Sequence, residues 1–125
     1  MGTFSDTVAN EWLDALARND SYANAAVWVQ LHTGDPGSAG TANVAGETDR
    51  VQATFGSAAS GRAISNTAVI EWLAVSNTET YTWVSLWSAS TSGTFLGRDD
   101  LSSSAAVTAG DTFRIPIGDL DLTIT

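Results

Sequence analysis

Residues 26–37 read AVWVQLHTGDPG, and this stretch decides the fold class. Val27, Val29 and Leu31 alternate with the side chains between them, which is the two-residue period of a half-buried strand. Residues 34–37 then carry a turn signal, because proline presets one backbone dihedral angle and glycine permits a positive φ. A strand that ends in such a turn predicts a sheet of short antiparallel strands.

Seven further segments of strand character follow, separated by turn signals at short intervals. They are residues 50–55, 62–64, 68–73, 81–87, 94–101, 113–117 and 120–125. About eight strands at this spacing predict a mainly β protein, an antiparallel β-sandwich of jelly-roll or immunoglobulin-like type. Residues 38–49 are small and polar and predict a long surface loop. The 125 residues are expected to form one domain, with a helical segment at 1–20 and the sandwich at 26–125.

The beginning of the chain has the period of a helix instead. Val8, Trp12, Leu13 and Leu16 recur at spacings of three and four, which predicts one amphipathic helix over residues 4–18. A serine and a threonine near its start are candidate N-caps. The apolar face of this helix packs either on the chain's own sheet or on a neighbouring subunit, and the sequence leaves both open.

Charge and composition exclude several classes of function. Fourteen acidic residues against five basic ones give a net charge of −9, so the chain is not expected to bind nucleic acid or an anionic membrane surface. It has no apolar run of membrane-spanning length and no signal-peptide pattern at its start. The absence of cysteine excludes disulfides, thiolate metal sites and a cysteine nucleophile.

No motif predicts an enzyme. His32 is the one histidine, and nothing marks which serine or carboxylate would complete a catalytic set with it, so a packed or surface imidazole is the expectation. Neighbouring carboxylates are expected to be solvated turns or faces rather than acid–base pairs or a Ca²⁺ site. They occur at Glu47 and Asp49, Asp99 and Asp100, and Asp119 and Asp121. The sequence therefore predicts no catalytic residue, no cofactor and no metal.

Aromatic side chains gather on the segment 81–87. The strand period places Tyr81, Trp83 and Trp87 on one face. Such a row is used by carbohydrate-binding modules to stack sugar rings, which gives one alternative function. A core or a subunit contact is the favoured interpretation, because a small domain with few leucines and isoleucines needs large side chains to fill its interior.

The order of the quoted segments resembles a known group of proteins. The N-terminal helix is followed by VWVQLH (27–32), the TGDPG turn (33–37), RVQATFG (50–56), VSLW (84–87), SGTFL (92–96) and AGDTFRIPIGDLDLTI (109–124). This order is similar to that of small virion proteins of tailed bacteriophages, often labelled tail-fibre or minor tail proteins, and to small β-sandwich capsid decoration proteins. The resemblance covers nearly the whole chain and brings no catalytic residues with it.

The resemblance implies a non-enzymatic structural protein of the virion, assembled in the host cytoplasm. The leading hypothesis is a decoration protein on the capsid exterior that binds major capsid proteins, as a homo-oligomer such as a trimer. A minor tail or tail-fibre component, contacting tail proteins, and a carbohydrate-binding module are the alternatives. The residues predicted to form the partner interface are Phe4, Val8, Trp12 and Leu16 on the helix, and Thr33, Gly34, Asp35, Pro36 and Gly37 in the turn.

Overall fold

The central sheet of the molecule contains the strand formed by Val27–His32. The computed structural model of the chain describes residues 3–24 and 26–124. The strands are antiparallel, and their order across the sheet is β1 (Thr3–Phe4), β7 (Phe95–Val107), β6 (Glu79–Trp87), β2 (Val27–His32) and β3 (Val51–Ala53). Because β6 pairs with β7 on one side and β2 on the other, these three long strands form the middle of the sheet.

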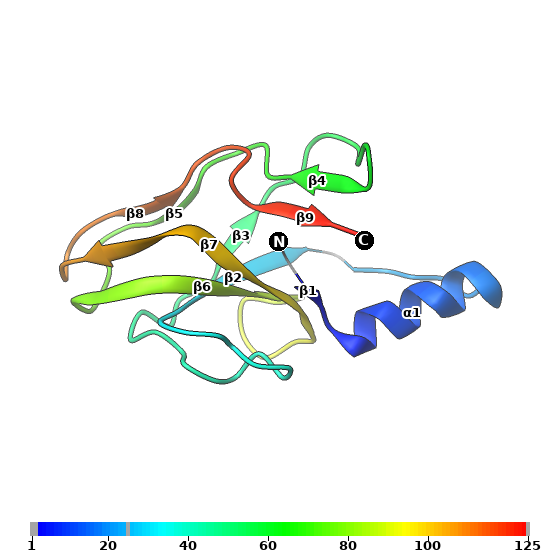
Figure 1. Cartoon of the computed structure of the whole chain (residues 1–125), viewed down its shortest axis with the longest axis horizontal. Helices are drawn as coiled ribbons and strands as arrows, with labels where there is room; N and C mark the ends of the chain where they lie inside the picture. Colours follow the sequence, from blue (N-terminus) through cyan, green and yellow to red (C-terminus); the bar gives the residue numbers. More distant parts are fainter. Residues whose placement is uncertain (1–2, 25, 125) are drawn as a thin grey trace.

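A second layer covers one face of this sheet. It is divided into two short antiparallel pairs, β4 (Ala63–Ser65) with β9 (Asp121–Thr123) and β5 (Ile70–Trp72) with β8 (Phe113–Ile115). Figure 1 shows both pairs on the same side of the large sheet. The predicted antiparallel sandwich is confirmed, with one continuous layer and one divided layer.

The core lies between the two layers. Val29 and Leu31 of β2 and Val84 and Leu86 of β6 point into it, each at most 2% exposed. The second layer contributes Ile70, Trp72, Ile115 and Leu122. These side chains stand on alternate positions of their strands, as the two-residue period predicts. In β2 and β6 the residues between them, such as His32 and Ser85, are buried as well, on the opposite face of the sheet.

The helix α1 (Asp6–Ala17) precedes the sandwich. The Ser5 side chain caps its start by accepting a hydrogen bond from the backbone N–H of Val8 at 3.2 Å. At the other end Asn19 takes a left-handed φ of 58°, and the N–H of Asp20 bonds back to the carbonyl of Asp14. The predicted helix is confirmed with slightly shorter bounds, because Thr3–Phe4 is a strand; residues 1 and 2 of the predicted segment lie outside the described residues.

All eight predicted strands are present, but two of them are longer than predicted. β6 begins at Glu79, and β7 continues to Val107 through a run of three serines whose polar side chains gave no strand signal. The pairing of Glu79 with Val107 and of Thr80 with Ala106 holds this extension. The short strand β1 was not predicted, and Thr125 of the last predicted strand lies outside the described residues.

Candidate functional site

The predicted interface residues of the helix lie in different environments. Val8 is 1% exposed, and Trp12 packs against the core with its ring centroid 4.6 Å from that of Phe4. Leu16, one turn further along the helix, is 85% exposed. The first turns of the helix therefore pack on the chain's own sheet, and its last turn presents an apolar side chain to the surroundings; packing on a neighbouring subunit stays a prediction.

The second half of the helix and the segment after it project from the β layers (Figure 1). We call this projection the arm and define it as residues 9–24. Its two segments contact each other, since the ring centroid of Tyr22 lies 6.2 Å from that of Trp12. Leu13 is 61% exposed and Leu16 is 85% exposed, so the arm carries apolar surface that the chain itself does not bury.

An apolar groove of about 330 Å³ lies at the base of the arm, and we call it the base groove. Its lining includes Val8, Trp12, Arg62, Ile64, Leu122 and Ile124. Arg62 is its one charged lining residue, is exposed, and forms no ion pair with any residue that the structure describes. The base groove is thus an apolar hollow with a guanidinium group among its lining residues.

Loops cover the face of the large sheet that points away from the core, and His32 lies beneath them. The N–H on Nδ1 of His32 donates to the carbonyl of Ala42 at 2.8 Å, which leaves Nε2 as the acceptor for the Ser85 hydroxyl at 2.7 Å. The Ser85 oxygen in turn accepts a hydrogen bond from the Trp87 indole N–H at 2.7 Å. One tautomer therefore satisfies all three side chains, and burial lowers the pKa of His32.

This histidine–serine pair has the residue types of a catalytic dyad, but a substrate cannot reach it. His32 and Ser85 are both 0% exposed, and the loop carbonyl of Ala42 occupies the second ring nitrogen of the histidine. A nucleophile must reach a substrate atom, and here the protein's own groups fill every position around the hydroxyl. The pair holds the loop on the sheet through the hydrogen bond from His32 to Ala42. His32 is thus a packed imidazole, which is one of the two environments expected from the sequence.

The aromatic row expected on one face of β6 does not exist. A β-bulge between Tyr81 and Trp83 turns Tyr81 to the core side, where its ring centroid lies 5.2 Å from that of Phe113. Trp87 is 9% exposed, because the Arg50 guanidinium lies 4.2 Å from its ring centroid. The alternative of Tyr81, Trp83 and Trp87 as a sugar-stacking platform is therefore wrong, since two of its three rings are covered.

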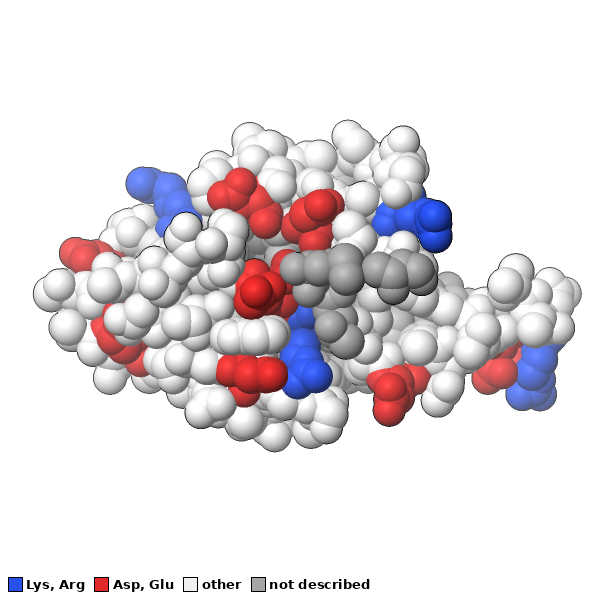
Figure 2. All heavy atoms as spheres, in the orientation of Figure 1, with Lys and Arg blue, Asp and Glu red and all other residues white. Residues whose placement is uncertain are grey.

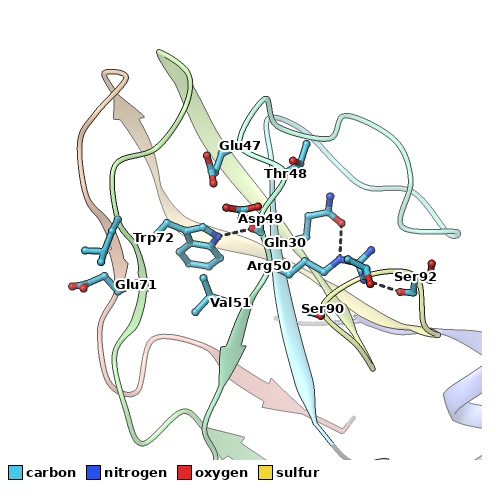
Figure 3. A pocket seen from close by; sticks show the side chains of 12 residues that line it. Gln30, Glu47, Thr48, Asp49, Arg50, Val51, Glu71, Trp72, Ser90 and Ser92 are labelled. Carbon is cyan, nitrogen blue, oxygen red and sulfur yellow. Dashed lines mark hydrogen bonds between the residues drawn. The ribbon is translucent and has the colours of Figure 1, made fainter.

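A polar hollow of about 670 Å³ lies beside this face (Figure 3). Trp72 is the one aromatic residue among those that line it. This side chain is 2% exposed and donates its indole N–H to the Asp49 carbonyl at 2.8 Å. The Arg50 side chain on its wall donates to the Gln30 side chain and to the carbonyl of Ser92. Glu71 pairs with Arg114. The Arg50 guanidinium, the Glu47 and Glu71 carboxylates and the Trp72 indole N–H are thus engaged within the chain.

The predicted turn residues Thr33, Gly34, Asp35, Pro36 and Gly37 begin the loop that covers His32. The Asp35 carboxylate accepts hydrogen bonds from the Gly37 N–H at 2.9 Å and from the Arg98 guanidinium at 2.8 Å. Pro36 is fully buried. The turn therefore has a structural role inside the molecule, and its use as a partner interface stays a prediction.

The carboxylate pairs divide between surface and interior. Asp119 and Asp121 are exposed, as predicted. Glu47 and Asp99 are 7% and 6% exposed, so their assignment to solvated turns or faces is wrong. Glu47 accepts hydrogen bonds from the N–H and the hydroxyl of Ser76, and burial raises the pKa of Asp99. Within residues 3–24 and 26–124 no group of three such side chains has the geometry of a metal site.

The charges are spread over the surface. Figure 2 shows carboxylates scattered over the β layers and the arm, with the guanidinium groups on that face apart from one another. None of the helices in the described part of the chain has the length and hydropathy to cross a membrane.

The base groove was not predicted from the sequence. Its lining comes from the helix, from the segments around Tyr22 and Phe55, and from strands of both layers, which are distant along the chain. Ile64 and Leu122 are opposite each other in the β4–β9 pair, but only the pairing makes them neighbours.

Comparison with known proteins gives one family. Residues 3–123 match the family described as podophage GP4 fiber I protein gp80. This range includes the helix, the arm and every strand. No protein with a curated description matches the chain.

Proposed function

Since this chain belongs to the family of the podophage GP4 fiber I protein gp80, and is thus a structural component of a phage virion, we propose that it is an adhesive subunit of the particle surface. In this proposal the arm attaches it to a neighbouring subunit. The observation that carries the proposal is the exposure of Leu13 and Leu16 on a projection that the chain's own core does not need. Burying such side chains contributes about 25 cal/mol per Å² of apolar area removed from water.

The interior of the molecule supports a role without chemistry. The His32–Ser85 pair is sealed beneath a loop, and the Arg50 guanidinium at the polar hollow donates to groups of its own chain. What the surface offers to a partner is packing area and charge. A protein that acts by adhesion needs no more than this.

A fibre is the first candidate for the place of this subunit on the particle, because the matching family is described as a fiber protein. The exterior of the head, with major capsid proteins as partners, is the second candidate. It is favoured by the shape of the chain, a short sandwich with one arm rather than an elongated repeat. Both candidates use the same adhesive surface.

Copy number and position on the particle test the proposal. We expect the chain in purified particles, at a fixed ratio to the major capsid protein and at a defined place in an image reconstruction. A ratio of a few chains per particle, with density at the tail, selects the fibre; a ratio close to that of the major capsid protein, with density on the head, selects decoration. Purified particles that lack the chain would overturn the proposal.

Incorporation of variants tests the role of the arm. Leu16→Glu places a charge on the arm, and Leu73→Glu makes the same change at a leucine that is 70% exposed on the opposite end of the sandwich, after β5. We expect the first variant to be reduced at least tenfold in purified particles and the second to be incorporated like the unchanged chain. Equal incorporation of both variants would show that the arm does not attach the subunit.

A further inference from the structure

We infer that the neighbour of the arm is a second copy of this chain, whose base groove receives Leu13 and Leu16. This inference rests on the proposed use of the arm as an adhesive surface and names its partner. The contact joins two different surfaces of the same chain, both of which every copy carries.

The two surfaces match in chemistry. The arm presents leucine side chains that are 61% and 85% exposed, and the base groove is a hollow of about 330 Å³ lined almost entirely by apolar groups. An apolar helix edge laid into an apolar groove is a common way for proteins to associate. A hollow with so few polar groups suits aliphatic side chains and offers little to a polar ligand.

The two surfaces also match in charge. The arm carries Glu11, Asp14 and Asp20 and one basic residue, Arg18, which pairs with Asp14, so the arm has an excess of two negative charges. The base groove has Arg62 as its one charged lining residue, and within the described chain Arg62 has no acidic partner. An arm from another copy brings carboxylates to this guanidinium, which favours the arm over an uncharged apolar segment and opposes a basic one.

The exposed leucines of the arm, Leu13 and Leu16, do not line the base groove of their own chain, although Trp12, Tyr22 and Asn24 at the root of the arm do. Val8 and Trp12 line that groove, so the helix is rooted in its wall. Leu16 lies eight residues beyond Val8, or about 12 Å further along the helix axis at 1.5 Å per residue. The helix points away from the β layers (Figure 1), and Leu16 is 85% exposed, so this side chain is available to the groove of another copy.

A contact between two different surfaces of one chain has defined symmetries. Two copies exchange arms about a two-fold axis, or each arm fills the next groove around a closed ring. The trimer expected from the sequence is the ring with three members. In both arrangements each copy uses one arm and one groove.

Sedimentation velocity on the purified chain tests this inference. The groove variant is Ile124→Glu, at a lining residue that is 52% exposed, and the arm variant is Leu16→Glu. The matched controls are Ile117→Glu and Leu73→Glu, at residues 62% and 70% exposed that line neither surface. We expect the unchanged chain and both controls to associate as concentration rises, and the arm and groove variants to associate at least tenfold more weakly.

Mixing the two defective variants distinguishes a specific arm–groove contact from nonspecific hydrophobic association. The arm variant keeps an intact groove, and the groove variant keeps an intact arm. An equimolar mixture therefore has one working contact per pair, and we expect a complex of two chains that neither variant forms alone. A mixture that stays monomeric, while the unchanged chain associates, would overturn the arm–groove contact.

Cysteine pairs test whether the contact is between chains, because the sequence has no cysteine of its own. Leu16→Cys and Ala59→Cys place single thiols on the arm and on an exposed residue of the groove wall. After mild oxidation of the mixed variants we expect a disulfide-linked pair containing one of each. In the chain that carries both substitutions, an internal disulfide would mean that the arm folds onto its own groove, and the inference would be wrong.

The outcomes for this inference and for the proposed function are separable. A chain that remains monomeric at every concentration, but whose Leu16→Glu variant is lost from particles, refutes the second copy as partner and leaves the adhesive arm in place. A chain that associates through arm and groove in solution but is absent from purified particles refutes the proposed function alone.

Discussion

The arm and the loop-covered face of the sheet both contain candidate functional residues of the sequence. They differ in whether the chain itself supplies the contacts that these side chains need. Under the loop, His32, Ser85 and Trp87 form a closed series of hydrogen bonds, and the two that carry the catalytic residue types are fully buried. On the arm, Leu13 and Leu16 remain exposed although they continue an apolar face that is buried at Val8. The polar groups under the loop find all their partners within the chain, whereas the apolar side chains of the arm are not buried by it.

This difference separates structure from function. A buried polar group with its partners in place stabilises one conformation, and its substitution damages the fold. An exposed apolar group contributes little to the isolated chain, and its substitution damages what the chain binds. The comparison therefore predicts large effects on stability under the loop and small ones on the arm.

The largest effect is expected for Ser85→Ala. This change leaves the Nε2 atom of His32 and the indole N–H of Trp87 buried without a partner. At about 1–3 kcal/mol for each of these two unsatisfied groups, we expect the free energy of unfolding to fall by about 2–6 kcal/mol in urea denaturation. Ser90→Ala, at an exposed serine, is the control and should change it by no more than about 0.5 kcal/mol. Equal effects from both would mean that the buried network does not stabilise the fold.

Gly40→Ala is expected to have the next largest effect. Gly40 lies in the covering loop with φ of +75°, and a Cβ atom there would stand 2.4 Å from Cδ1 of the Phe95 ring. The left-handed backbone costs about 1–2 kcal/mol for a residue with a side chain, and the displaced ring adds about 1 kcal/mol or more. Gly118→Ala is the matched control, because Gly118 has φ of +85° and open space around the added atom.

Thermal unfolding of these two glycine variants isolates the contact with the ring. Both pay for the backbone conformation, so the difference between them is the cost of pushing the loop off Phe95. If both lose the same stability, the loop is held by its hydrogen bonds and not by close packing on the sheet.

Much of the fold was predictable because it depends on local periodicity. The alternation at Val27, Val29 and Leu31 predicted β2, and the spacing of Val8 and Trp12 predicted α1. The errors occur where pairing outweighs local preference. The serine run in β7 becomes a strand because β6 pairs with it, and the bulge at Tyr81 reverses a face that the simple two-residue period had assigned.

The functional surfaces were less predictable, because they depend on contacts between distant segments. The sequence identified the helix face but not the point at which burial ends, since Val8 and Leu16 carry the same apolar signal and differ only in what lies beside them. His32 and Ser85 are 53 residues apart, and only the pairing of β2 with β6 brings them together. The base groove has no sequence signature, because its lining residues come from segments throughout the chain, between Phe4 and Ile124.

The next effect is on pH dependence. Burial is the main cause of the lowered pKa of His32, so the unfolded chain binds a proton at a higher pH than the folded one. The stability from the neutral imidazole is therefore complete above about pH 6.5 and is lost as the pH falls toward the folded pKa, by up to about 1.4 kcal/mol per pH unit. As the chain has one histidine, its imidazole proton resonance reports the folded pKa directly. A value at or above 6.5 would contradict the closed network.

The smallest effect on stability is expected at Leu16, and it is the sharpest test of the comparison. Leu16→Ala removes a side chain that is 85% exposed from a helix that alanine favours, so the free energy of unfolding of the monomer should change by no more than about 0.5 kcal/mol. Leu86→Ala, at a leucine that is 2% exposed, should cost about 2–5 kcal/mol. Both must be measured at concentrations below any self-association, because binding to another copy would add stability that belongs to the complex. A large loss from Leu16→Ala in the dilute monomer would place that side chain in the chain's own core and remove the physical basis for an unsatisfied arm.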